Sequence, residues 1–118
     1  MATVLIVDDS KVMRSLIRAI FIKLGHEVIG EATTGLEGFD KYISLNPDLI
    51  TMDITMPVLN GIETLKKIKE HDPNAKVILL TANLQGAKLN EAISAGADGY
   101  LFKPLQEEEL KSLLEQIL

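Results

Sequence analysis

The sequence predicts an α/β protein with one doubly wound, five-stranded parallel sheet that is covered by helices on both faces. Five short apolar runs alternate with five segments whose apolar residues repeat at helical spacing. Continuous apolar runs are typical of parallel strands buried on both faces. Short connections join each strand to its helix, so we expect right-handed crossovers. The length of 118 residues suits one domain, expected to span residues 1–118 without an appended output domain.

Three apolar runs in the first half of the chain predict strands at Val4–Val7, Glu27–Ala32 and Leu49–Met52. The helix between the first two ends at Gly25. Its apolar stripe consists of Met13, Leu16, Ile17, Ile20, Phe21 and Leu24. The second helix opens at Thr34 and Glu37, which have the spacing of a capping box, and closes at Asn46-Pro47. The apolar residues that it carries are Leu36, Phe39 and Ile43.

Two further apolar runs in the second half predict strands at Lys76–Leu80 and Gly99–Phe102. A helix over Gly61–His71 precedes the first of them, with three inward residues, Ile62, Leu65 and Ile68. The helix between the two strands is broken by Gly96 and carries Leu89, Ala92 and Ile93. The last helix spans roughly Gln106–Leu118. Its apolar residues are Leu110, Leu113, Leu114 and Ile117.

Composition excludes several classes of protein. The absence of cysteine removes disulfide scaffolds, thiol catalysis and cysteine-ligated metal sites. The chain carries 12 basic and 17 acidic residues, and its densest basic stretch, Lys66 to Lys69, lies among acidic residues, so we expect no direct binding of nucleic acid. Apolar stretches such as Val77–Leu80 are far shorter than the roughly 20 residues of a membrane span. Since no signal-peptide pattern opens the chain either, we expect a cytoplasmic protein without membrane insertion.

Polar side chains stand where four of the predicted strands end. Asp8 and Asp9 follow the first strand, and Asp53 ends the third. Thr81 follows the fourth strand, and Lys103 follows the fifth. The carboxyl ends of parallel strands lie at one edge of a sheet, which is where ligands bind in open α/β folds. We therefore expect these five side chains to converge on one rim.

Each of these residues alone has a purely structural explanation. Asp8 or Asp9 can cap the next helix, and Asp53 can begin a turn. Together they indicate chemistry, because two carboxylates 4 Å apart repel by about 4 kcal/mol at an effective dielectric of about 20. A cluster of three would recruit a cation, and Mg²⁺ binds carboxylates while staying open to phosphate. With the Thr81 hydroxyl and the Lys103 ammonium, the set suits a phosphoryl-acceptor site.

The motifs at these positions resemble those of the two-component response-regulator receiver domain, in its stand-alone, CheY-like type. They are Asp8-Asp9, Met52–Pro57, Gly61, Thr81-Ala82 and Lys103-Pro104. Their order and spacing extend over the whole chain. The resemblance implies a flavodoxin-like fold with strand order 2-1-3-4-5. Asn60 stands where the family often has Asp, a change that we expect to matter little.

The resemblance also implies a role for each site residue. Asp53 is the expected phosphoacceptor, and a sensor histidine kinase or a phosphotransfer protein is the expected donor. Asp8, Asp9, Asp53 and the backbone carbonyl of Thr55 are expected to hold Mg²⁺. Lys103 is expected to bind the phosphoryl oxygens, next to a cis peptide bond to Pro104.

A conformational switch from Thr81 to Tyr100 is the last implied feature. Thr81 is expected to be drawn to the phosphoryl group, and Tyr100 to swing inward on an output face of the fourth helix, fifth strand and fifth helix. An ordinary amphipathic surface ring is the alternative for Tyr100. The expected protein is a regulator rather than an enzyme. The expected downstream target is a partner such as a flagellar motor, a chemotaxis component or a phosphorelay component.

Three other classes of protein are alternatives to a phosphorylated receiver domain. A magnesium-dependent phosphohydrolase would have its aspartyl nucleophile after the first strand in an Asp-x-Asp pattern, which Asp8-Asp9-Ser10 lacks. A flavodoxin-type module would need a phosphate-binding loop where this chain has two carboxylates. A receiver-like module that is never phosphorylated is the third, and the retention of all five site residues argues against it.

Overall fold

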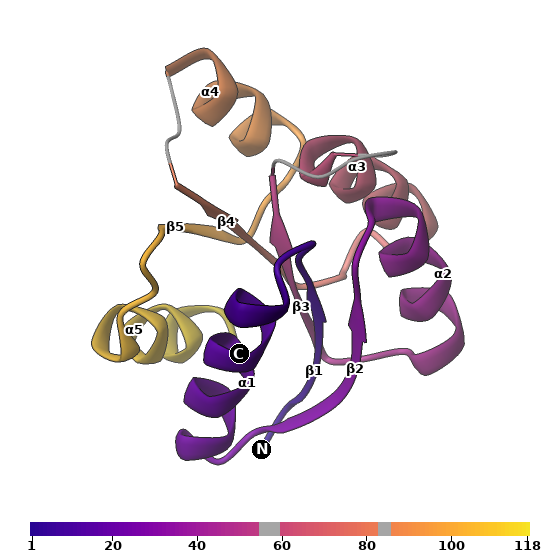
Figure 1. Cartoon of the computed structure of the whole chain (residues 1–118). Coiled ribbons are helices and arrows are strands. Elements are labelled where there is room, and N and C mark those ends of the chain that lie inside the picture. Colours follow the sequence, from indigo (N-terminus) through magenta and orange to yellow (C-terminus); the bar gives the residue numbers. More distant parts are fainter. Residues whose placement is uncertain (55–59, 83–85) are drawn as a thin grey trace.

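A single parallel sheet forms the centre of the molecule (Figure 1). The computed structural model describes residues 1–54, 60–82 and 86–118, with residues 86–89 described by their backbone. The strands are β1 (Thr3–Val7), β2 (Glu27–Ala32), β3 (Leu49–Asp53), β4 (Val77–Thr81) and β5 (Gly99–Phe102). Their order is β2-β1-β3-β4-β5, and every neighbouring pair is parallel. The predicted flavodoxin-like sheet and its strand order are confirmed.

Helices cover both faces of this sheet, as predicted. They are α1 (Lys11–Lys23), α2 (Gly35–Leu45), α3 (Gly61–His71), α4 (Gly86–Ser94) and α5 (Glu107–Ile117). Helices α1 and α5 lie side by side on one face, while α2 and α3 lie on the other (Figure 1). Ala92 joins α4 to the cluster that α2 and α3 cover. No helix in the described part of the chain is long and apolar enough to cross a membrane.

Two apolar clusters hold the layers together, one on each face of the sheet. Along β1, Leu5 and Val7 face the cluster under α2 and α3, whereas Val4 and Ile6 face the cluster under α1 and α5. All four side chains are buried, because a central parallel strand is covered on both sides. This two-sided burial explains why the strands appear in the sequence as continuous apolar runs.

Of the three apolar residues that the sequence marks on α2, only Phe39 packs against the apolar cluster beneath the helix. Leu36 and Ile43 are exposed, and Gly38 and Tyr42 are buried instead. A β-carbon on Gly38 would lie 2.8 Å from Cγ2 of Val7, so the glycine lets the helix approach β1 closely. The sequence alone gave no sign that a small residue, rather than Leu36, would face inward.

Residues at the helix ends differ in part from the sequence expectations. Ser10, not Asp8 or Asp9, caps α1, since its Oγ accepts a hydrogen bond from the Met13 N–H at 3.2 Å. Thr34 caps α2 as its spacing predicts, but the carboxylate of Glu37 accepts from the N–H of Thr33 rather than from Thr34. Neither Asp8 nor Asp9 is therefore the N-cap residue of α1.

Candidate functional site

Four strands place five polar side chains at the carboxyl edge of the sheet. Strands β1, β3, β4 and β5 are consecutive neighbours, so their carboxyl ends lie in a row. Asp8 and Asp9 follow β1, and Asp53 is the last residue of β3. Thr81 ends β4 and pairs with Phe102, the residue before Lys103. The edge that the strand pattern predicts is therefore the edge that brings these residues together.

Three of these residues form a compact acidic cluster. One carboxylate oxygen from each of Asp8, Asp9 and Asp53 lies within 4.8 Å of the other two. The side chain of Asp8 is wholly buried and Asp53 is nearly so, while Asp9 is exposed. Oxygen donors of this kind, grouped this closely and open to solvent on one side, fit the preference of Mg²⁺ for a few carboxylates and several retained waters.

An ammonium group lies between two of the carboxylates. Nζ of Lys103 lies 2.9 Å from Oδ2 of Asp8 and 3.5 Å from Oδ1 of Asp53. The Lys103 main-chain N–H donates to the carbonyl of Thr81 at 2.7 Å, which extends the pairing of β5 with β4 by one residue. The peptide bond from Lys103 to Pro104, which the resemblance implies to be cis, is cis in the structure. Lys103 offsets part of the negative charge of the cluster.

The backbone around Asp53 is fixed by a glycine on α3. The Gly61 N–H donates to the carbonyl of Ile54 at 2.9 Å. A β-carbon on Gly61 would lie 2.4 Å from the main-chain oxygen of Asp53, closer than any real contact. Only glycine allows α3 to approach the end of β3 this closely. The sequence motif marked Gly61 without revealing this reason.

The cap of α3 is a second feature that sequence reasoning did not use. Oδ1 of Asn60 accepts from the N–H of Glu63 at 2.9 Å, and the Glu63 carboxylate accepts from the N–H of Asn60. The two side chains form a reciprocal capping box, whose spacing was readable in the sequence. Asn60, where the family often has Asp, therefore caps the helix that carries Gly61.

The remaining predicted site residues differ in how far they are buried. Thr81 is buried, whereas Tyr100 on β5 is 38% exposed and so faces outward in this conformation. Thr55 lies outside the described residues, so its carbonyl has no assigned position.

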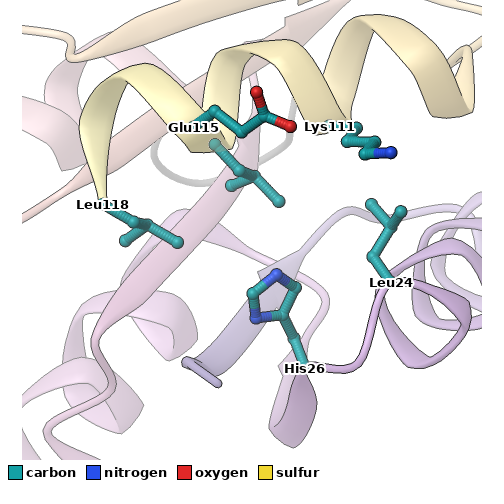
Figure 2. Close-up of a pocket in the computed structure, with 6 residues that line it drawn as sticks. Leu24, His26, Lys111, Glu115 and Leu118 are labelled. Atoms are coloured by element: carbon teal, nitrogen blue, oxygen red, sulfur yellow. The ribbon is translucent and has the colours of Figure 1, made fainter.

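A separate pocket lies near the opposite, amino-terminal end of the strands, where α1 and α5 finish (Figure 2). Its volume is about 330 Å³, and it is lined by Leu24, His26, Lys111, Leu114, Glu115 and Leu118. His26 uses Nδ1 to accept a hydrogen bond from the Ala2 N–H at 3.0 Å. The acidic cluster shares none of these residues, so the pocket is distinct from the candidate site.

Residues 4–115 match the family model of the response regulator receiver domain. The chain belongs to this family. A chemotaxis protein CheY from Thermotoga maritima is 48% identical over 97% of this chain and 95% of its own. The protein CcdB of Bacillus subtilis is 44% identical over 100% of this chain and 98% of its own.

Solved structures of receiver domains agree with this membership. CheY in the CheX–CheY–BeF3–Mg complex from Borrelia burgdorferi superimposes with a TM-score of 0.92 and 34% identity, over 98% of this chain and 87% of the other. A chemotaxis protein CheY4 from Vibrio cholerae gives 0.91 and 32%, over 100% and 99% of the two chains. This receiver domain is therefore of the CheY type. Membership of this family favours the receiver-domain hypothesis over the phosphohydrolase and the flavin-binding module.

Proposed function

We propose that this receiver domain is a phosphorylation-switched signalling protein that accepts a phosphoryl group on Asp53. The observation that supports it is the position of the Asp53 carboxylate, which lies within 4.8 Å of the Asp8 and Asp9 carboxylates and 3.5 Å from Nζ of Lys103. Nucleophile, cation ligands and ammonium thus belong to one cluster. The proposed donor is the phosphohistidine of a sensor kinase or of a phosphotransfer protein.

The proposed reaction is a displacement at phosphorus. A carboxylate oxygen of Asp53 attacks the phosphorus, the P–N bond of phosphohistidine breaks, and the imidazole leaves and takes up a proton from solvent. The product is an acyl phosphate on Asp53. Attack of water on the same phosphorus then releases inorganic phosphate and restores the carboxylate. The protein returns to its starting state, as befits a regulator rather than an enzyme with an external product.

Charge on the transferred group needs positive partners, because it is spread over three equatorial oxygens. Asp8, Asp9 and Asp53 would hold Mg²⁺, which would supply a Lewis-acidic partner for one of these oxygens and lower the repulsion between carboxylate and phosphate. The Lys103 ammonium, already 3.5 Å from Asp53, is the partner for a second oxygen. The Thr81 hydroxyl, at the end of the adjacent strand, is the partner for the third.

The switch that we propose connects Thr81 to the surface. Movement of the Thr81 side chain toward the phosphoryl group would open space beneath the end of β4. Tyr100 lies on the neighbouring β5, opposite Leu79, and is 38% exposed. Its rotation inward would change the face formed by α4, β5 and α5, which is the proposed docking surface for a downstream protein. The cytoplasm is the proposed compartment, because the proposed phosphate donors work there.

Locating the modified residue tests the proposal. The protein is phosphorylated with acetyl phosphate and Mg²⁺, and borohydride reduction then converts an acyl-phosphorylated aspartate into homoserine. We expect peptide mass spectrometry to find homoserine at position 53 alone. Homoserine at another aspartate would overturn the assignment of Asp53. Failure to label any residue, in a protein that folds, would favour a receiver-like module that is never phosphorylated.

A further inference from the structure

Arg14 on α1 makes a contact that links it directly to the acidic cluster. Its Nη1 donates to the main-chain carbonyl oxygen of Asp8 at 2.8 Å. Its Nε donates to Oε1 of Glu31, on β2, at 3.0 Å. The Arg14 side chain is only 14% exposed, so both contacts are shielded from solvent. One planar guanidinium thus joins α1, β2 and the backbone at the end of β1.

Glu31 holds this guanidinium from the other side and is itself held by a second arginine. Nε of Arg18 donates to Oε2 of Glu31 at 2.7 Å. Burial alone would raise the pKa of Glu31, but the hydrogen bonds and charges of Arg18 and Arg14 more than offset it, and the pKa lies below its usual range. Glu31 therefore stays ionised at neutral pH and keeps Arg14 in place.

The carbonyl that Arg14 binds belongs to the peptide unit between Asp8 and Asp9. A peptide unit is planar, so a contact that fixes the Asp8 carbonyl also fixes the position of the Asp9 Cα in the same plane. Asp8 has other restraints, because its N–H donates to Ala32 and its carboxylate binds Lys103 and the Ser10 N–H. Asp9 is exposed, and nothing in residues 1–54, 60–82 and 90–118 hydrogen-bonds its carboxylate.

We propose that Arg14 is a positioning residue of the cation site, which orients the Asp8–Asp9 peptide so that the Asp9 carboxylate is held near Asp8 and Asp53 before a cation binds. Ordering a ligand in advance strengthens binding because less conformational freedom is lost when the cation arrives. Residues that hydrogen-bond to metal ligands without touching the metal act in this way, and their removal weakens metal affinity by about 10- to 100-fold. The inference rests on the magnesium site of the proposed function.

Arg18 provides a matched control for the test. Arg14→Gln and Arg18→Gln each remove one of the two arginine contacts to Glu31, but only Arg14 contacts the Asp8 carbonyl. The dissociation constant for Mg²⁺ is measured calorimetrically for wild type and both variants. We expect a rise of at least ~10-fold in Arg14→Gln and less than about 2-fold in Arg18→Gln. Equal effects in the two variants would overturn the inference.

A second measurement needs no metal. Amide hydrogen exchange at Asp9 and Ser10 is followed in the Mg²⁺-free proteins, and we expect it to be faster in Arg14→Gln than in Arg18→Gln. Unchanged exchange at both amides in Arg14→Gln would contradict a positioning role. If Arg14→Gln does not fold, Arg14→Lys and Arg18→Lys replace the pair, since lysine lacks the planar fork that serves Glu31 and the Asp8 carbonyl together.

Wild-type behaviour separates this inference from the proposed function. If the wild type binds Mg²⁺ and the two arginine variants have the same affinity for it, only the role of Arg14 is overturned. A wild type that binds no Mg²⁺ would overturn the magnesium site of the proposed function and the inference with it.

Discussion

The ammonium nitrogen of Lys103 lies 2.9 Å from Oδ2 of Asp8, although 95 positions separate the two residues in the sequence. The Asp8 side chain is wholly buried, and that of Lys103 is 16% exposed. A buried carboxylate needs a partner, because its transfer from water is costly unless charge and hydrogen bonds offset the loss. Among the described residues at this edge, three clustered carboxylates face this one ammonium, which leaves negative charge for a divalent cation to neutralise.

Removal of the Lys103 ammonium should destabilise the protein most strongly when Mg²⁺ is absent. Lys103→Met leaves the buried Asp8 carboxylate without its cation, and we expect the free energy of unfolding to fall by about 3 kcal/mol. Added Mg²⁺ should restore much of this loss, since it binds the folded state. Urea denaturation with and without Mg²⁺ measures both effects.

Lys23 supplies the control for that variant. Its Nζ lies 2.9 Å from Oε1 of Glu107, the same distance, but the Lys23 side chain is 72% exposed. Exposed ion pairs contribute little, so Lys23→Met should change the free energy of unfolding by less than about 0.5 kcal/mol. Equal losses in Lys23→Met and Lys103→Met would show that burial of Asp8 is not what makes Lys103 matter.

A methyl group at position 61 should disturb both stability and the site. Gly61→Ala places a β-carbon 2.4 Å from the Asp53 carbonyl oxygen, so α3 or the end of β3 must shift. We expect a loss of about 2 kcal/mol and a weaker affinity for Mg²⁺. Gly25→Ala is the control: its φ of +88° gives strain, but no atom lies within 4 Å of the added carbon. It should lower stability and leave Mg²⁺ affinity unchanged; a parallel loss of Mg²⁺ affinity would argue against a local effect of Gly61.

A buried hydroxyl on β3 should be dispensable. Within the described residues, Oγ1 of Thr51 is buried without a hydrogen-bond partner. Valine has nearly the same shape, so Thr51→Val should leave the free energy of unfolding unchanged or raise it. Thr64 is the contrasting case, because its buried hydroxyl donates to the Asn60 carbonyl at 2.9 Å. Thr64→Val should lose about 1 kcal/mol, and a comparable loss in Thr51→Val would reveal a partner for that hydroxyl.

Acidification should weaken the fold through His26. Burial, and then the positive charge of the chain N-terminus, lower the pKa of His26 below 6.5. The unfolded chain therefore takes up the proton first, so this contribution to stability is complete above about pH 6.5 and is lost as pH falls through the folded-state pKa. His26→Gln should flatten the pH dependence of unfolding in that window. A retained slope in His26→Gln would assign the effect to other groups.

The sequence predicted the sheet and the site edge because both depend on local patterns. Apolar runs such as Val4–Val7 mark strands buried on both faces, and parallel strands place the residues after them, such as Asp8 and Lys103, at one edge. Neither inference needs knowledge of how side chains pack.

Other features depend on contacts between distant segments, and local patterns do not contain them. On α2, Tyr42 is buried and its hydroxyl donates to Asp72, at the end of α3, whereas Leu36 is exposed. Ser10 caps α1, while the Asp8 carboxylate accepts from the Ser10 N–H and pairs with Lys103, which lies 95 positions further along the chain. These outcomes became visible only when the whole fold was assembled.

The most direct test of the central claim is the intact mass of the protein after incubation with acetyl phosphate, with and without Mg²⁺. The proposed site predicts a gain of one phosphoryl group, about 80 Da, that requires Mg²⁺, is lost on treatment with hydroxylamine, and is absent in Asp53→Asn. Asp53→Asn removes the nucleophile while keeping the size of the side chain. A mass gain that persists in Asp53→Asn, or no gain in the folded wild type under either condition, would contradict the account.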